Sequence, residues 1–342
     1  MNSKPNILLI YTGGTIGMIK DFETGSLRNF NFDELLNHIP ELNLLDCHIE
    51  TTSFEEPIDS SNMNPNYWVE IAIMIEENYD NFDGFVVLHG SDTMSYTSSA
   101  LSFMLENLNK PVIFTGSQLP IGDLRTDAKE NLITSIQIAA LQENGLPVVR
   151  EVGLYFEYKL YRANRTTKIN AEHFEAFASL NYPPLIESGV HLTINYAALI
   201  RASVVKKLKV HKKLESHILL IKMFPGLDKE TMEYLLDYPN LKGLILETYG
   251  SGNVTNRKWF IEAITNIIEK GIPVVNITQC SGGSVAMGYY ETSIQLRNIG
   301  VISGKDCTTE AALAKLMYLL GKNVEANSFK TNFETQLRGE ML

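Results

Sequence analysis

The sequence has little cysteine, a shortage of positive charge and no long apolar run. Only three cysteines, Cys47, Cys280 and Cys307, occur in 342 residues, without a Cys-x-x-Cys pair, which gives no sign of a disulfide framework or a zinc knuckle. The longest apolar runs, such as residues 218–221, fall far below the roughly 20 residues of a membrane helix. The apolar run at residues 7–11 is too short for an export signal. We expect a soluble, cytoplasmic protein.

Acidic side chains outnumber basic ones, 40 to 29, which gives a formal net charge of −11. Such a chain repels phosphate backbones and anionic lipids, so we expect neither a nucleic acid nor a membrane as a partner. The lysine-rich stretch at residues 206–213 could form a phosphate site. Because no aromatic residues are interleaved with these lysines, a solvated linker is the better interpretation.

Short aliphatic runs that end in glycine, hydroxyl or amide residues indicate buried parallel strands. In the first half of the chain they are residues 7–11, 85–88, 112–114 and 152–156, with helical patterns at 67–77 and 95–108. In the second half, runs at 217–223, 242–246 and 273–277 alternate with helical patterns at 257–270 and 309–320. This alternation predicts an α/β fold based on parallel sheets.

The length predicts two domains, because single hydrophobic cores rarely grow to 342 residues. Residues 179–215 break the alternation with two prolines, a glycine and the lysines, a composition typical of a hairpin followed by a linker. We therefore predict a larger N-terminal α/β domain at residues 1–190, a linker or hairpin at 191–215 and a smaller C-terminal α/β domain at 216–342.

Three of the predicted strands run into turns that combine glycine with hydroxyl side chains. These turns are Thr12-Gly13-Gly14-Thr15-Ile16-Gly17, His89-Gly90-Ser91-Asp92-Thr93 and Thr115-Gly116-Ser117-Gln118. Each turn alone has an ordinary explanation, since glycine permits positive φ and Ser, Thr or Asp caps the next helix. Together they predict a hydroxyl-rich pocket at the carboxyl ends of the strands, where ligands bind in parallel sheets.

A hydroxyl is a poor nucleophile at neutral pH unless a base takes its proton. Asp92 and Lys168 are the candidates for this base. A lone lysine such as Lys168 is most often a surface residue, and Asp92 could be only a cap on the following helix. Because their spacing in the sequence does not place them together, the residues alone leave the base unassigned.

Several motifs resemble those of the type I, cytosolic bacterial L-asparaginases. They are Tyr-Thr-Gly-Gly-Thr-Ile-Gly-Met at 11–18, Leu-His-Gly-Ser-Asp-Thr-Met at 88–94 and Asn-Arg-Thr-Thr-Lys at 164–168. The similarity also covers Asp59-Ser60-Ser61-Asn62-Met63, residues 115–118, Tyr249-Gly250-Ser251-Gly252-Asn253 and Thr278-Gln279-Cys280, and so spans essentially the whole chain.

The resemblance implies hydrolysis of L-asparagine to L-aspartate and ammonia, with no metal and no organic cofactor. It implies that Thr15 is the nucleophile, which forms a threonine-linked acyl-enzyme, and that a relay assists proton transfer. The relay residues are Ser91, Asp92 and Lys168; the implied substrate-binding residues are Asp59, Ser60, Ser61 and Ser117, together with Asn253 from a neighbouring subunit. A homo-oligomer, either a dimer or a tetramer, is also implied.

Three positions depart from the family's pattern. Ser91 stands where the family normally has threonine, which keeps the hydroxyl but removes a methyl that stiffens the rotamer. The polar stretch Lys20 to Phe30 suits a mobile lid, but Ser26 stands where several relatives carry a tyrosine. Glu247 stands where some relatives have an arginine in an effector site. These departures leave open which group activates Thr15 and whether an effector site exists.

Other functions fit parts of the sequence. Residues 13–17 are similar to a dinucleotide-binding turn but lack the full Gly-x-Gly-x-x-Gly pattern, which weakens a nucleotide-binding module as an alternative. A non-catalytic protein that binds an amino acid is a second alternative. Among enzymes, the nearest alternative is the amidase subunit that acts on tRNA-linked glutamine, although an RNA substrate does not suit the negative charge.

Overall fold

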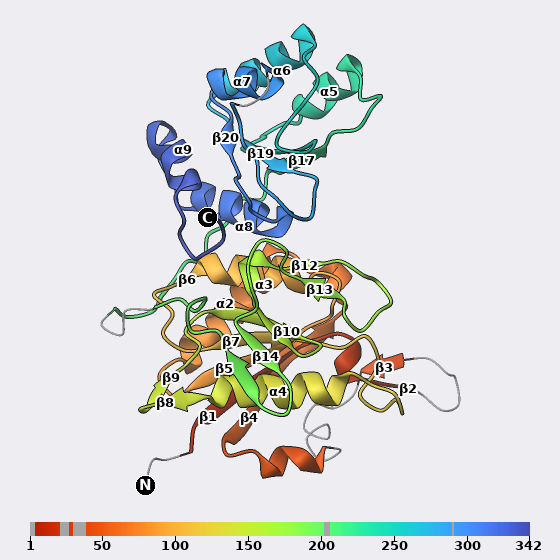
Figure 1. The fold of residues 1–342 in the computed structure, drawn as a ribbon, viewed down its shortest axis with the longest axis vertical. Coiled ribbons are helices and arrows are strands. Elements are labelled where there is room, and N and C mark those ends of the chain that lie inside the picture. Colours follow the sequence, from red (N-terminus) through yellow and green to blue (C-terminus); the bar gives the residue numbers. More distant parts are fainter. Residues whose placement is uncertain (1–3, 21–26, 30–38, 202–205, 289–290) are drawn as a thin grey trace. The chain divides into compact units, whose positions relative to one another are not determined.

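The computed structural model describes residues 4–20, 27–29, 39–201, 206–288 and 291–342 (Figure 1). The chain divides into two compact units, Met1–Lys212 and Lys213–Leu342. Each unit combines helices with a sheet that is largely or wholly parallel, which confirms the predicted two-domain α/β fold with the larger part first. Most of the predicted lid, including Gly25 and Ser26, lies outside the described residues.

The first unit is built on an eight-stranded sheet with the order β15-β14-β11-β10-β7-β5-β1-β4. Five neighbouring strands are parallel: β1 (Asn6–Gly13), β4 (His48–Ile58), β5 (Gly84–Leu88), β7 (Val112–Thr115) and β10 (Val152–Phe156). Three antiparallel strands complete the sheet: β11 (Lys159–Arg162), β14 (Ile186–Ser188) and β15 (Leu192–Ile194). The parallel strands therefore end at a common edge.

Helices cover this sheet because alternate side chains of each buried strand point to opposite faces. The helices are α2 (Pro65–Asn78), α3 (Met94–Met104) and α4 (Ala128–Ala140). On one face, Ile7 and Leu9 of β1 share a core with Leu132 and Ile136 of α4, which Figure 1 shows lying in front of the sheet. The unit also contains short two-stranded antiparallel sheets: β2 (Met18–Lys20) with β3 (Leu27–Asn29), β8 (Gln142–Glu143) with β9 (Leu146–Pro147), β12 (Thr167–Lys168) with β13 (Phe177–Ala178), and β6 (Leu105–Glu106) with β16 (Lys209–Val210).

The predicted helix over 95–108 is too long at its carboxyl end. Leu105 leaves the helical conformation with φ −93° and ψ 77°, and α3 ends at Met104. The next residues form β6 instead, which pairs with β16 from the lysine-rich stretch. In that stretch Lys212 also forms an ion pair with Glu76 of α2 at 2.5 Å, which holds this lysine within the first unit.

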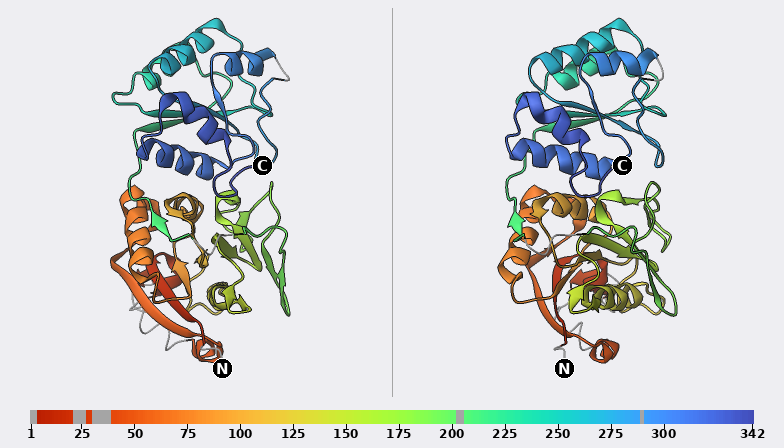
Figure 2. Two further views of the ribbon diagram at one scale, coloured as in Figure 1. Left: turned by 90° about the vertical axis from the view of Figure 1, so that its left-hand side faces the viewer. Right: turned by 60° about the vertical axis from the view of Figure 1, so that its left-hand side comes forward.

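The second unit has a four-stranded parallel sheet of β17 (Ile218–Lys222), β18 (Gly243–Thr248), β19 (Val274–Thr278) and β20 (Ile302–Ser303). Its helices are α5 (Lys229–Leu236), α6 (Lys258–Glu269), α7 (Glu291–Asn298), α8 (Thr309–Gly321) and α9 (Ala326–Glu334). Figure 2 shows α5, α6 and α7 on one face of the sheet and α8 and α9 on the other. The core beneath α6 contains Leu244, Leu246, Phe260 and Ile264.

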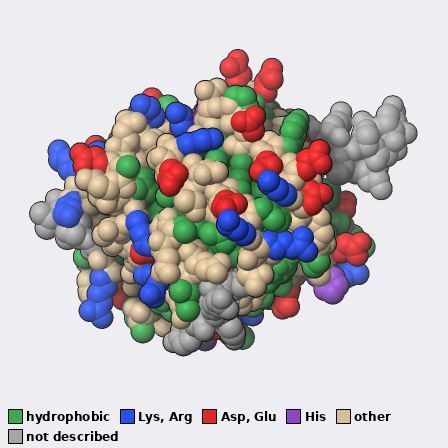
Figure 3. Space-filling view, turned by 90° about the horizontal axis from the view of Figure 1, so that it is seen from above, with side chains coloured by type: hydrophobic (Ala, Val, Ile, Leu, Met, Phe, Trp, Pro, Cys, Tyr) green, Lys and Arg blue, Asp and Glu red, His purple; other side chains and the backbone are tan. Residues whose placement is uncertain are grey.

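One face of the molecule is mixed in charge. On the face that Figure 3 shows, basic and acidic side chains are interspersed among the described residues. Within the described part of the chain, no helix is both long and apolar enough to span a membrane.

Candidate active site

Four neighbouring strands of the first unit end at one edge of the sheet, and the turns that carry the candidate residues follow them there. The pairings Gly13 with Ile58 and Leu88 with Thr115 align the ends of β4, β1, β5 and β7. Side-chain hydrogen bonds connect the turns, since Thr12 Oγ1 donates to the Leu88 carbonyl at 3.0 Å. Thr93 Oγ1 likewise donates to a backbone carbonyl of the turn after β4 at 2.7 Å. The turns therefore form one continuous site.

The turn that carries Thr15 depends on Gly14. Gly14 has φ 92° and ψ 170°, a conformation that is essentially restricted to glycine. A Cβ at this position would lie 2.5 Å from the backbone N and Cα of Gly90. The missing side chain thus allows the first and second turns to touch. Thr15 follows in a short 3₁₀ helix, Thr15–Gly17, and its side chain is partly exposed at the site.

Tyr11 packs against this turn, a role that no sequence motif indicated. Its side chain is buried, and a Cβ on Gly17 would lie 2.3 Å from its ring. The Tyr11 hydroxyl lies 3.5 Å from the Gly14 carbonyl oxygen. Burial raises the pKa of Tyr11 to about 12, so the phenol keeps its proton and acts as a packing group rather than a base.

Lys168 meets Ser91 and Asp92, although 77 and 76 residues separate it from them. Its Nζ donates to Ser91 Oγ at 2.9 Å and to Asp92 Oδ1 at 2.7 Å. The Lys168 side chain is 18% exposed, whereas that of Asp92 is 66% exposed. Hence the amine is shielded beside the hydroxyl, while the carboxylate faces solvent where a substrate can reach it.

His89 stands in the same motif but does not belong to the reactive groups. It is fully buried, and its Nδ1 lies 2.7 Å from the Gly90 carbonyl oxygen. Burial lowers the pKa of His89 to about 4, so the imidazole is neutral at physiological pH. It therefore holds the turn between β5 and α3 in shape.

The turn after β4 presents Asp59, Ser60 and Ser61. Asp59 Oδ1 accepts hydrogen bonds from the Ser61 backbone N–H and hydroxyl, both at 2.8 Å. The bond from the backbone N–H is the larger of the two effects that lower the pKa of Asp59, so its exposed carboxylate stays ionised. Ser60 is buried against Gly90, where an added Cβ would lie 2.4 Å from Ser60 Oγ. The arrangement offers a fixed negative charge to a small cation.

The turn after β7 contributes a contact that no sequence pattern indicated. Ser117 is 2% exposed, and its hydroxyl donates to the Leu119 carbonyl at 2.6 Å within the same turn. Gln118 instead reaches the site, because its Oε1 accepts a hydrogen bond from Ser91 Oγ at 3.3 Å. The hydroxyl-glycine pattern pointed to the turn but gave no signal for the amide.

The second unit holds the two remaining positions of interest. Asn253 forms a β-bridge with Tyr249 at the end of β18. Glu247 is 8% exposed and accepts a hydrogen bond from Thr309 Oγ1 at 2.5 Å. Its other oxygen, Oε2, lies 3.6 Å from Lys222 Nζ. The Glu247 carboxylate is therefore engaged within its own unit.

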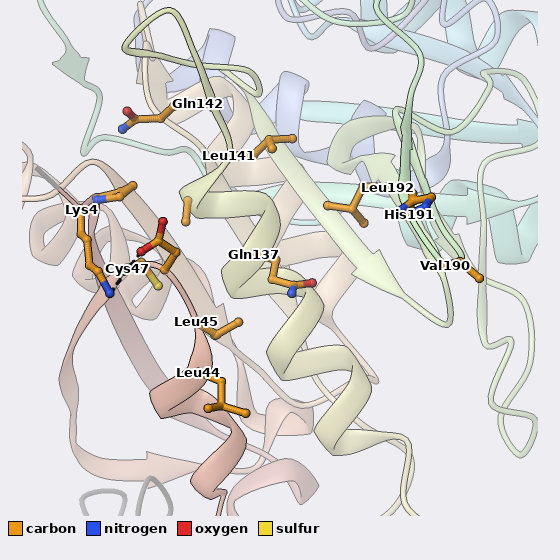
Figure 4. A pocket seen from close by; sticks show the side chains of 13 residues that line it. Lys4, Leu44, Leu45, Cys47, Gln137, Leu141, Gln142, Val190, His191 and Leu192 are labelled. Atoms are coloured by element: carbon orange, nitrogen blue, oxygen red, sulfur yellow. Dashed lines mark ion pairs between the residues drawn. The ribbon is translucent and has the colours of Figure 1, made fainter. Parts of the chain in front are cut away.

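A groove of about 850 Å³ lies at the amino ends of β1 and β4, away from the turns described above (Figure 4). Its wall carries the ion pair between Lys4 and Asp46, at 3.1 Å, and the side chain of Cys47. Burial raises the pKa of the Cys47 thiol, which keeps it protonated and poorly nucleophilic. In the described ranges, no three His, Cys, Asp or Glu side chains gather in a way that could hold a metal ion. The turns at the carboxyl edge remain the better candidate site.

Comparison with known proteins gives matches over nearly the whole chain. Residues 6–199 match the family model "Asparaginase, N-terminal", and residues 217–333 match "Glutaminase/Asparaginase C-terminal domain". The chain is 42% identical to L-asparaginase 1 of Escherichia coli strain K12, over 99% of this chain and 98% of that protein. It is 36% identical to a glutamyl-tRNA(Gln) amidotransferase subunit of Methanobrevibacter smithii, over 99% of this chain and 77% of that protein.

A solved structure shares the fold. L-asparaginase I from Vibrio cholerae superposes with a TM-score of 0.90 at 40% identity, covering 99% of both chains. Sequence and fold thus agree, and this chain is a member of the asparaginase family.

Proposed function

We propose that this protein hydrolyses L-asparagine to L-aspartate and ammonia, with Thr15 as the nucleophile. The observation that carries the proposal is the contact of Lys168 with both Ser91 and Asp92, beside the turn that presents Thr15. This pairing of a shielded amine, a hydroxyl and a carboxylate suits proton transfer to and from a hydroxyl nucleophile. The high identity to an L-asparaginase supports the same reaction.

In the proposed reaction, Thr15 Oγ bonds to the carbon of the substrate's side-chain amide. The C–N bond then breaks, and ammonia leaves with the proton that Thr15 gives up. Water attacks the resulting β-aspartyl ester, which releases aspartate and restores the Thr15 hydroxyl. Backbone N–H groups in the glycine turns are suited to stabilise the negative charge that develops on the amide oxygen. The relay of Ser91, Asp92 and Lys168 assists these proton transfers.

Binding of the substrate needs one partner for its ammonium and others for its carboxylate. Asp92 is exposed and Asp59 stays ionised, so both carboxylates are suited to the ammonium. Ser60, Ser61 and Ser117 lie in the turns that surround them, and we propose these three residues as the contacts for the substrate's remaining polar atoms. Asn253 is proposed to reach the site from a neighbouring subunit.

The test is ammonia release from L-asparagine in a coupled assay, with the full-length protein. We expect Thr15→Ala to keep its circular dichroism spectrum and lose turnover, because the variant lacks the proposed nucleophilic hydroxyl. Thr193→Ala provides a matched control, since Thr193 is exposed on the edge strand β15. Wild-type activity in Thr15→Ala would refute the assignment of Thr15.

A substrate panel separates this proposal from the alternatives. Release of ammonia from free L-asparagine excludes a protein that only binds an amino acid or a nucleotide. Turnover that required tRNA-linked glutamine would instead favour the activity named for the amidotransferase subunits. Rates of ammonia release from glutamine and from D-asparagine, measured under the same conditions, would define the substrate selectivity.

We also propose a cytoplasmic location and a homo-oligomeric state, either dimer or tetramer, as the family resemblance implies. All three cysteines are free thiols, which suits a reducing compartment. Two-fold symmetry is the expected arrangement for such an assembly. Light scattering coupled to size-exclusion chromatography measures the oligomeric state directly, and a monomer would contradict the proposed role of Asn253.

A further inference from the structure

The side-chain amide of Gln118 is held in one orientation. Its Nε2 lies 3.3 Å from the Ala171 carbonyl oxygen and 3.0 Å from the His173 carbonyl oxygen. Carbonyl oxygens only accept hydrogen bonds, so the NH₂ group must face them. The amide oxygen Oε1 is thereby directed towards Ser91, whose hydroxyl lies 3.3 Å away.

The backbone of Gln118 is also held in place. Asp127, at the amino end of α4, accepts a hydrogen bond from the Gln118 backbone N–H at 2.9 Å and another from that of Leu119 at 3.2 Å. Asn131 donates to the same carboxylate at 3.2 Å. Gln118 is thus anchored at its main chain by one element and at its amide by another.

The hydroxyl of Ser91 has two described hydrogen-bond partners, of which one donates and the other accepts. Lys168 Nζ donates to its oxygen, so the Ser91 proton is directed to the other partner, Gln118 Oε1. Serine has no β-methyl group, and its χ1 angle has three staggered minima of similar energy unless a neighbour selects one. An amide oxygen is too weak a base to remove the proton, so its contribution is to select the orientation.

We propose that Gln118 is a positioning residue, which holds the Ser91 hydroxyl in the rotamer that meets Lys168. The inference rests on the proposed hydrolase function. In this role the Gln118 amide restricts the χ1 angle of Ser91. A threonine at position 91 would need no such partner, because its own β-methyl group restricts χ1. Gln118 contacts Ser91, a member of the proposed relay, so it acts through the relay.

The first test is Gln118→Met, which keeps the length of the side chain and removes both hydrogen-bonding functions. Because the hydrogen bond that orients Ser91 is lost together with the restriction of its rotamer, we expect kcat to fall about tenfold. KM should stay within about twofold, since substrate-binding groups are untouched. Gln137→Met, on the exposed face of α4, is the matched control and should keep wild-type kinetics.

The second test repeats Gln118→Met in a Ser91→Thr background. The methyl group of threonine restricts χ1, so the same substitution should now lower kcat by less than about twofold relative to Ser91→Thr alone. A merely structural role of Gln118 would give the same loss in both backgrounds. If Gln118→Met fails to fold, Gln118→Asn serves instead, because the shorter amide cannot span Ser91 and the two carbonyls.

The outcomes separate the two proposals. An active wild-type protein with an unchanged kcat in Gln118→Met, or with equal losses in both backgrounds, would overturn the role of Gln118 alone. A wild-type protein without ammonia release from L-asparagine would overturn the proposed function itself.

Discussion

Replacement of Gly14 by alanine tests the contact between the turns that form the site. The backbone of Gly14 adopts φ 92° and ψ 170°, and the added methyl would lie 2.5 Å from the N and Cα atoms of Gly90. Both are backbone atoms, so no flexible side chain can move aside. Relief of the overlap requires the turn that carries Thr15 to move away from the turn that carries Ser91.

Gly14→Ala should lower both the rate of the reaction and the stability of the fold. Carbon atoms in contact normally lie about 3.5 to 4.0 Å apart, so the turns must separate by roughly 1 Å. A misplacement of about 1 Å between reacting groups can lower the rate by about a hundredfold. The conformation itself costs a non-glycine residue about 1 to 3 kcal/mol, which adds a loss of stability.

The assay compares Gly14→Ala with Gly145→Ala in kcat/KM and in unfolding by urea. Gly145 also has positive φ, at 75°, but a Cβ there meets nothing within 4 Å. Gly145→Ala therefore reports the cost of a non-glycine residue at positive φ without the clash, and its kcat/KM should stay within about twofold of wild type. If Gly14→Ala matched Gly145→Ala in activity, contact between the two turns would not control the site.

Two further predictions concern buried or half-buried charges. Burial, together with neighbouring carboxylates, raises the pKa of Glu157 from 4.5 to about 7, so this group lowers the free energy of unfolding as pH rises through that window. After allowance for its partial exposure, Glu157→Gln should be more stable than wild type by about 1 to 2 kcal/mol above pH 7, with no gain below pH 4.5. Lys315 and Glu340 form a fully buried ion pair in the second unit. Lys315→Met should lower the free energy of unfolding of the second unit by about 3 to 5 kcal/mol, because it leaves the buried Glu340 carboxylate without its partner. The double variant Lys315→Met, Glu340→Gln should recover part of this loss.

Tryptophan fluorescence can follow these changes separately, because each unit contains one tryptophan, Trp68 in the first and Trp259 in the second. In a Trp68→Phe background, only the second unit reports, and Lys315→Met should shift its urea midpoint. An unshifted midpoint would show that the pair contributes no net stability. For Glu157→Gln, a stability gain that did not change between low and high pH would contradict the raised pKa.

Local features of the sequence determined the turns of the site. Buried aliphatic runs such as residues 7–11 and 85–88 become strands because their burial stabilises extended chain on both faces of a sheet. Glycine and hydroxyl residues that follow them then form turns at the carboxyl ends, and the motifs around Thr15 and Ser91 identified the family. These inferences needed no knowledge of long-range contacts.

Other elements escaped the patterns because their residues are mixed in polarity. Strand β4 (His48–Ile58) has mostly exposed or half-buried side chains at the edge of the sheet, so it lacks an aliphatic run. Helix α3 ends before Leu105, since the residues that follow form β6 and pair with the distant strand β16. Helical periodicity in residues 95–108 carried no information about that partner.

Only the tertiary structure decided which groups act together at the site. The sequence named Lys168 and Ser91 as candidates, but the order of strands and the fold of the following segment bring their atoms to 2.9 Å across 77 residues. The same holds for Gln118, whose amide is oriented by carbonyl groups of Ala171 and His173. A local pattern specifies the conformation of a short segment, whereas contacts between distant side chains depend on how all segments pack, and so the sequence determined the turns and the fold determined their chemistry.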